Sequence, residues 1–252
     1  VNIMVAWLGG LTYTLQIYYD FSGYSDMAIG LAKMFGFDFK ENFQYPYGAL
    51  GIKDFWSKWH ISLSSWFKEY LYIPLGGNRK GPIRTIVNKY IVFFITGLWH
   101  GANWTFIIWG LLHGTLLVLE DSKKISIRQL KNRGIIHIYT WVAIITTFVL
   151  FRASTLEQGL LFIKEMYTGF FINQETLTTF FMGFTPMFIV VLFISLIFIF
   201  PVKEVANKWF AKSKLITGIL PNLVYVVIIV LLLLNIINLS SSTYVPFIYL
   251  KF

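Results

Sequence analysis

The most constraining feature of this chain is an uncharged stretch of 30 residues, Tyr90 to Leu119, which carries His100 near its centre. As one helix it would measure about 45 Å, whereas the hydrocarbon core of a bilayer is about 30 Å thick. Gly97, Gly101 and Asn103 interrupt the stretch, and irregular backbone at membrane depth is tolerated only inside protein or beside a cavity. We therefore expect two partial helices that meet near His100, and His100 faces either a protein-lined chamber or a hydrogen-bond partner on a neighbouring helix.

The composition excludes a soluble domain. Of the 252 residues, 56% are hydrophobic and only 13% are charged, and the mean hydropathy is +0.65. We therefore predict an all-α, polytopic transmembrane protein. The net charge of +9 lies in short clusters between apolar segments, so it indicates topology and contact with anionic lipid, not nucleic acid. The absence of cysteine excludes a cysteinyl thioester and cysteine-based metal sites, and no other spacing suggests a metal.

Apolar periodicity predicts four further crossings and one interfacial or re-entrant helix. The crossings are Ile3 to Tyr19, Ile135 to Phe151, Phe180 to Phe200 and Leu220 to Ile237. The interfacial helix is Phe55 to Tyr72, which has an aromatic face between lysines. Because Val1 already lies in an apolar segment, we expect residues 1–252 to form a single membrane domain, the C-terminal part of a longer protein that has further N-terminal helices.

Basic residues in the loops predict the orientation. Glu120 to Arg133 and Lys203 to Lys214 are basic and are expected in the cytoplasm, whereas Arg152 to Glu175 is expected outside. Arg79 to Lys89 is basic as well, so it should also be cytoplasmic. The uncharged stretch would then leave and return on one side, which again favours a break near His100.

Four polar side chains are the candidates for chemistry. A neutral imidazole in a pocket of low polarity can take a proton from a hydroxyl group, and this suits the attack of an alcohol on a thioester. His60 shares a face of the predicted interfacial helix with Trp56, although a satisfied surface role explains it more simply. His113 could line the same chamber as His100 or simply pack between helices. Asp26 lies in a segment where carboxylates usually face the protein interior.

Four stretches carry a family resemblance: YYDFSGYSDMAIGLAKMFGF, ENFQYPY, DFWSKWHISLSSWFKEYLYIPLGGNRKG and GLWHGANWTFIIWGLLHG. Together, from about Tyr18 to Glu120, they resemble the membrane-bound O-acyltransferase family, in the bacterial branch that includes alginate O-acetylation proteins. The resemblance implies a multi-helix fold around a central tunnel, which the acyl donor and the acceptor enter from opposite sides. The N-terminal helices of that family have no counterpart in residues 1–252. We therefore expect part of the tunnel wall to lie outside this sequence.

The resemblance also implies roles for individual residues. The principal histidine of the family falls on His100, which would be the general base on the acceptor hydroxyl, and its second polar position falls on His60. Further tunnel residues would be Asp26, Asn103, His113, Trp56, Trp59 and Trp99. The tryptophans would exclude water, which would otherwise hydrolyse the thioester.

We therefore predict an O-acyltransferase, a multi-pass protein of the cytoplasmic membrane that binds no cofactor. It would transfer acetyl from a cytoplasmic thioester, acetyl-CoA, toward an extracytoplasmic cell-envelope polysaccharide, and the resemblance implies an SGNH-hydrolase-like extracytoplasmic partner. D-alanyl transfer to teichoic acid is the second reading. Two alternatives come from other classes of protein. One is a transporter or flippase that uses Asp20, Asp26 and His100 as a polar path, and the other is a membrane scaffold.

Overall fold

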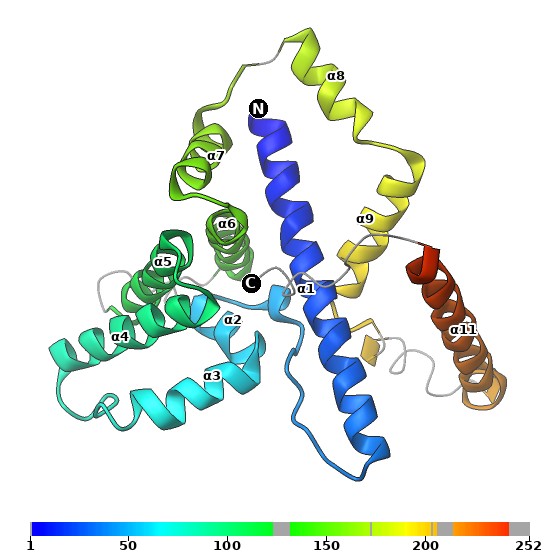
Figure 1. The fold of residues 1–252 in the computed structure, drawn as a ribbon, viewed down its shortest axis with the longest axis horizontal. Coiled ribbons are helices and arrows are strands. Elements are labelled where there is room, and N and C mark those ends of the chain that lie inside the picture. The colour runs from blue at the N-terminus through cyan, green and yellow to red at the C-terminus, as the bar shows by residue number, and fades with distance from the viewer. Residues whose placement is uncertain (1, 123–131, 172, 203, 206–213, 242–252) are drawn as a thin grey trace. The chain divides into compact units, whose positions relative to one another are not determined.

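The computed structural model describes residues 2–122, 132–171, 173–202, 204–205 and 214–241, and every regular element among them is helical (Figure 1). The chain forms two compact units, Val1–Ile199 and Phe200–Lys251. The second unit contains α11 (Lys214–Ser241), which includes the predicted crossing that ends at Ile237. Two basic loops are predicted to lie in the cytoplasm, Glu120 to Arg133 and Lys203 to Lys214, and most of each lies outside the described residues. The single membrane domain over residues 1–252 stays a prediction.

Helix α1 (Ile3–Met34) is longer than the crossing predicted for Ile3 to Tyr19, because it continues through Asp20 and Asp26. It begins where the Asn2 side chain accepts a hydrogen bond from the backbone of Val5. It packs against α6 (Arg133–Arg152) and α7 (Leu156–Thr168), and the three helices bury a small apolar core of Ala6, Ile145, Val149 and Met166. Helices α6 and α7 in turn contact α5.

The predicted break near His100 is confirmed. Helix α4 (Pro82–His100) and helix α5 (Trp104–Asp121) form a close hairpin, in which the carboxamide oxygen of Asn103 accepts a hydrogen bond from the backbone of Thr105 and so caps α5. The helices touch at Gly97 and Gly110, where a Cβ atom would overlap the facing backbone carbonyl. Gly101 adopts a φ of +149°, which other residues rarely take.

The predicted single helix from Phe55 to Tyr72 is wrong. The structure has α2 (Ile52–Lys58), α3 (Ile61–Phe67) and a π-helical turn, η2 (Lys68–Tyr72). The break lies at His60, which adopts a left-handed conformation with φ +45°. An upstream segment replaces the lost helical bonds, since Ile61 N donates to Asn42 O and Gln44 N donates to Lys58 O, each at 3.0 Å. His60 therefore does not share a helical face with Trp56.

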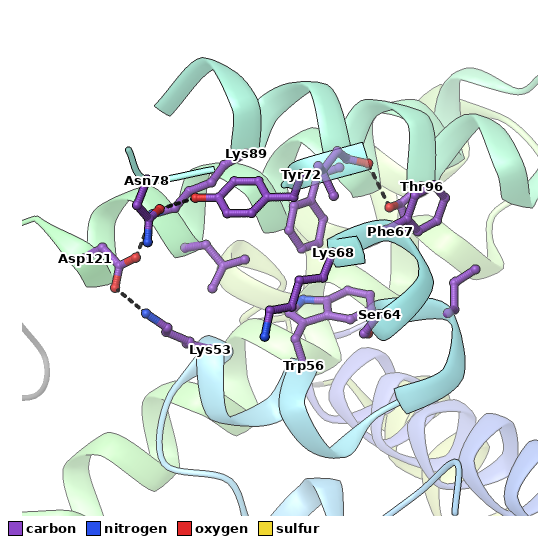
Figure 2. A pocket seen from close by; sticks show the side chains of 14 residues that line it. Lys53, Trp56, Ser64, Phe67, Lys68, Tyr72, Asn78, Lys89, Thr96 and Asp121 are labelled. Atoms are coloured by element: carbon purple, nitrogen blue, oxygen red, sulfur yellow. Dashed lines mark hydrogen bonds and ion pairs between the residues drawn. The ribbon is translucent and has the colours of Figure 1, made fainter. Parts of the chain in front are cut away.

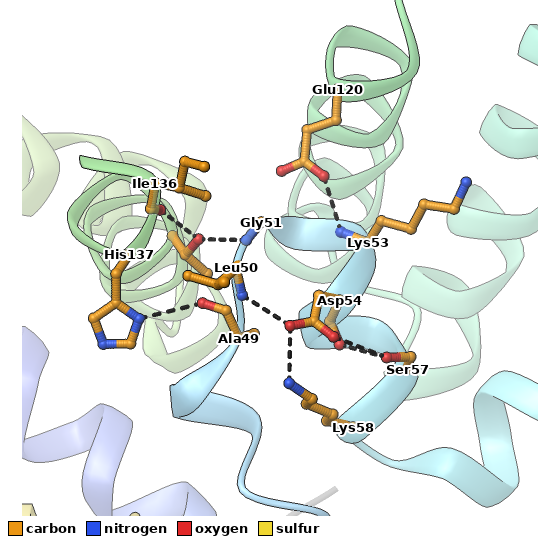
Figure 3. A network of polar contacts seen from close by, with 11 residues as sticks. Ala49, Leu50, Gly51, Lys53, Asp54, Ser57, Lys58, Glu120, Ile136 and His137 are labelled. Atoms are coloured by element: carbon orange, nitrogen blue, oxygen red, sulfur yellow. Dashed lines mark hydrogen bonds and ion pairs between the residues drawn. The ribbon is translucent and has the colours of Figure 1, made fainter. Parts of the chain in front are cut away.

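Two buried acceptors hold the N-terminus of α2 (Figure 3). The carboxylate of Glu120, at the end of α5, accepts hydrogen bonds from Ile52 N at 2.5 Å and Lys53 N at 3.0 Å. The hydroxyl of Thr140, on α6, accepts one from Gly51 N at 2.8 Å. A carboxylate at a helix N-terminus satisfies free N–H groups and faces the positive end of the helix dipole. Residues far apart in the sequence thus fix α2 against α5 and α6.

The third predicted crossing, Phe180 to Phe200, is not one straight helix. It falls on α8 (Gln174–Met182) and α9 (Pro186–Phe198), which are bent by 71° where Pro186 starts the second helix. Among the described residues, α6 is the one helix long and apolar enough to cross a bilayer, and the bent pair would add a second span if it acts as one. The crossing predicted for Ile135 to Phe151 is confirmed as such a helix, while the multi-pass topology stays a prediction.

Candidate functional site

His60 lies between α2 and α3 and is buried, with 8% of its surface exposed. The ring of Phe21 from α1 meets it edge to face at a centroid distance of 4.6 Å. Its Nδ1 atom lies 3.2 Å from Oδ1 of Asn42. The left-handed backbone conformation at His60 ends the right-handed helix there. The imidazole therefore leaves the chain in the direction of these partners and not along a helical face.

The contacts of Asn42 determine which nitrogen of His60 carries the proton. The same Asn42 oxygen lies 3.1 Å from the backbone nitrogen of Ser62, and since an N–H group can only donate, the Asn42 atom must be the acceptor. Nδ1 of a neutral His60 therefore donates to Asn42, and Nε2 keeps a lone pair. Burial lowers the pKa of His60 to about 4, so the ring is neutral near pH 7. Sequence reasoning missed Asn42, because nothing local connects it to a residue 18 positions later.

His100 ends α4 inside a cage of aromatic rings. The rings of Trp109 on α5 and Phe151 on α6 meet it edge to face at 5.3 and 5.0 Å. Trp99 lies 5.0 Å from the His100 ring and 6.1 Å from the His60 ring, and the two imidazoles are near enough for a charge on one to act on the other. The structure thus brings together two predicted histidines that are 40 positions apart in the sequence.

The predicted tryptophans and His113 lie around this pair in different settings. Trp99 is 57% exposed, whereas Trp59 is buried and stacks on Phe55 at 5.4 Å. Trp56 donates its indole N–H to Nδ1 of His113 at 3.2 Å. His113 is fully buried, so this bond orients both side chains within the helix packing.

The remaining two predicted tunnel residues lie at the edges of the site. Asn103 caps α5 and donates its amide to Ser154 O at 3.3 Å, which joins the hairpin loop to the end of α6. Asp26 is exposed on α1, within electrostatic reach of Glu41. The structure therefore does not bring Asp26 to the two histidines in the way that it brings Trp99.

A first cavity of about 320 Å³ lies among α2, α3, η2, α4 and α5 (Figure 2). Three lysines and one aspartate line it together with apolar side chains; they are Lys53, Lys68, Lys89 and Asp121. Asp121 pairs with Lys53 at 3.2 Å and with Lys89 at 2.7 Å, and no ion pair of Lys68 occurs among the described residues. The cavity therefore combines an apolar wall with an excess of positive charge.

A second cavity, of about 490 Å³, lies beside His60 and Trp99. It is lined by His60, Ser62, Leu63, Trp66, Phe67, Ile95 and Trp99. His60 is the only ionisable side chain in this lining. Leu63 and Phe67 line the first cavity too, so these two side chains stand between a lysine-rich space and a space that contains a neutral imidazole.

Comparison with known proteins places this site in a family. Residues 2–156 match the model of the membrane-bound O-acyltransferase family. A protein of Pseudomonas putida named "Probable alginate O-acetylase AlgI" is 37% identical over 98% of this chain and 53% of its own length. The peptidoglycan O-acetyltransferase of Helicobacter pylori is 46% identical over 66% of this chain and 32% of its own length.

The teichoic acid D-alanyltransferase of Bacillus subtilis is 34% identical over 42% of this chain and 28% of its own length. The chain thus spans about half the length of the Pseudomonas putida relative and about a third of the other two. The match to the family model includes both histidines and the two helices of the hairpin. The chain belongs to the membrane-bound O-acyltransferase family.

Proposed function

We propose that this chain carries the catalytic centre of a multi-pass membrane O-acetyltransferase. The enzyme transfers acetyl from acetyl-CoA on the cytoplasmic side to a hydroxyl group on the way to a cell-envelope polysaccharide outside. The observation that carries the proposal is that the Trp99 ring lies against both His60 and His100 and lines one cavity together with His60, in a chain of this family. His60 directly precedes α3, but its side chain makes no capping hydrogen bond to that helix.

In this reaction the acceptor oxygen attacks the thioester carbonyl carbon, and the C–S bond breaks. His100 acts as general base, takes the hydroxyl proton and returns it to the departing thiolate. His60, with its proton on Nδ1, presents the lone pair of Nε2 and holds a hydroxyl or water proton in place. The aromatic rings around His100 keep bulk water away from the thioester.

The two cavities support a division between donor and reaction space. Coenzyme A carries several phosphate negative charges, and the lysines of the first cavity are the complementary groups. Lys89 lines this cavity, and it belongs to the basic segment Arg79 to Lys89, which is expected to face the cytoplasm. The second cavity, with His60, would then receive the acyl group.

Acetyl transfer is favoured over D-alanyl transfer by the lining of the second cavity. The ammonium group of a D-alanyl ester would need an anionic partner, and the lining contains no carboxylate. The two relatives that match more of this chain are both named for O-acetylation. An SGNH-hydrolase-like partner outside the membrane would complete the transfer to the polymer.

The test compares ester-linked acetyl in envelope polysaccharide from cells that make full-length protein, either wild type or His100→Ala, at matched membrane levels. We expect acetyl to fall at least 100-fold with normal polymer yield, because general base catalysis contributes about 100- to 10,000-fold. His137→Ala is the matched control, since His137 bonds Ala49 O and Trp141 away from the site. Unchanged acetyl in His100→Ala would refute the catalytic role, and loss of polymer itself would favour the transporter.

A further inference from the structure

The side chains of Leu63 and Phe67 form the boundary between the two cavities. They lie four residues apart on α3 and therefore lie side by side on one face of that helix. Both are buried, with 9% and 4% of their surfaces exposed, and both line each cavity. No other residue is common to the two linings.

The two sides of this boundary differ in chemistry. The first cavity is lined by three lysines and one aspartate, Asp121, whereas the ionisable lining of the second consists of His60 alone. An anionic donor bound by the lysines would leave its acyl end against Leu63 and Phe67. Leu63 and Phe67 line both cavities, so an acyl group moving from the first cavity toward His60 would cross at these two side chains.

We infer that Leu63 and Phe67 form a constriction that sets the size of the acyl group transferred, admitting acetyl and holding back longer chains. The inference rests on the proposed function, because it assumes a thioester donor in the first cavity. The π-helical turn η2 directly follows Phe67, the last residue of α3, and such turns commonly occur at functional positions. The boundary residues thus belong to a short helix held between two irregular segments, at His60 and at η2.

The experiment is a competition between acetyl-CoA and butanoyl-CoA at equal concentration, using membranes with full-length protein and de-esterified envelope polysaccharide. Mass spectrometry of the released acids gives the ratio of acetyl to butanoyl esters. This ratio reports relative kcat/KM for the two donors and does not depend on how much of a variant folds. We expect wild type to favour acetyl at least 10-fold, since one methylene group typically changes discrimination about 10- to 200-fold.

Leu63→Ala and Phe67→Leu should each lower the ratio at least 10-fold, and Phe67→Ala should lower it further. Two substitutions are matched controls: Val92→Ala enlarges the first cavity alone, and Trp66→Ala the second alone. Both should leave the ratio within about twofold of wild type.

An unchanged ratio in both Leu63→Ala and Phe67→Leu would overturn the inference while leaving acetyl transfer intact. An equal fall in the Val92→Ala control would also overturn it, because selection would then lie elsewhere along the path. If wild type transfers neither acyl group from its CoA thioester, the proposed donor is wrong and the constriction falls with it.

Discussion

Asn42 offers the sharpest test of how the site is held together. Its carboxamide oxygen accepts hydrogen bonds from the Ser62 backbone N–H, the Ser62 hydroxyl and Nδ1 of His60, at 3.1, 3.0 and 3.2 Å. It therefore caps α3 and orients the imidazole with one atom. Asn42→Ala removes all of these bonds without touching either histidine.

The expected magnitude follows from these bonds. Loss of the helix cap costs about 1 kcal/mol and loss of the bond to His60 about 1 kcal/mol, whereas the exposed Ser62 hydroxyl can bond water instead, so stability should fall by about 2 kcal/mol. For the rate, about 1 kcal/mol of lost orientation of His60 corresponds to about 5-fold, and a displacement of 1 Å can cost about 100-fold. Acetyl transfer by Asn42→Ala should therefore fall between about 5- and 100-fold.

Asn42→Asp is the matched variant, because it keeps an oxygen acceptor for Ser62 and for Nδ1 of His60. Its carboxylate would also stabilise the imidazolium and raise the pKa of His60 above its value of about 4. We expect near-normal transfer at pH 8 and a fall toward pH 6, where wild type stays active because His60 remains neutral.

The assay measures acetyl transfer per amount of folded protein, from pH 6 to pH 8, in membranes that contain each full-length variant. Wild-type transfer by Asn42→Ala at all pH values would refute the argument that Asn42 orients His60. Equal losses in Asn42→Ala and Asn42→Asp at pH 8 would refute the assigned direction of the His60 hydrogen bond.

Two further predictions concern stability, each measured by thermal unfolding in detergent. Gly110→Ala should destabilise the α4–α5 hairpin by at least about 3 kcal/mol, because the added Cβ overlaps the carbonyl oxygen of Phe93. Gly114→Ala, one helical turn later, is the control. Its added Cβ would meet neighbouring side chains at an ordinary 3.4 Å, so the free energy of unfolding should stay unchanged or rise by up to about 1 kcal/mol. Equal losses of stability in the two variants would contradict the packing argument. Burial, the largest single cause, would raise the pKa of Asp54, but the hydrogen bonds from Lys58, Leu50 N and Ser57 and the charge of Lys58 together outweigh it, so the pKa is lowered. The Asp54 carboxylate thus stabilises the fold at pH values above its ordinary pKa of 3.8, and this stabilisation is lost as the pH falls through the lowered pKa. Wild type should therefore lose more thermal stability than Asp54→Asn between pH 7 and pH 3. An equal loss in the two proteins would contradict the pairing of Asp54 with Lys58.

Local sequence signals were enough to predict the helical class and the hairpin at His100. Glycines and an asparagine inside an apolar stretch indicate a helix break, and they do so through backbone preferences that act within a few residues. The crossing at Ile135 to Phe151 was predicted for the same reason, since its continuous apolar composition is a local property. The family could be recognised from motifs that are likewise contiguous.

Contacts between distant segments decided the rest of the site. Helical periodicity predicts an unbroken helix through His60, yet the backbone of Asn42 replaces the helical hydrogen bonds and allows the left-handed turn. The same holds for Glu120, which caps a helix 68 positions earlier in the sequence. Sequence patterns indicate which residues share a face within one helix. The partners of His60 depend instead on how separate helices pack. That packing is fixed only when the hydrogen-bond donors and acceptors of all the packed segments are satisfied together.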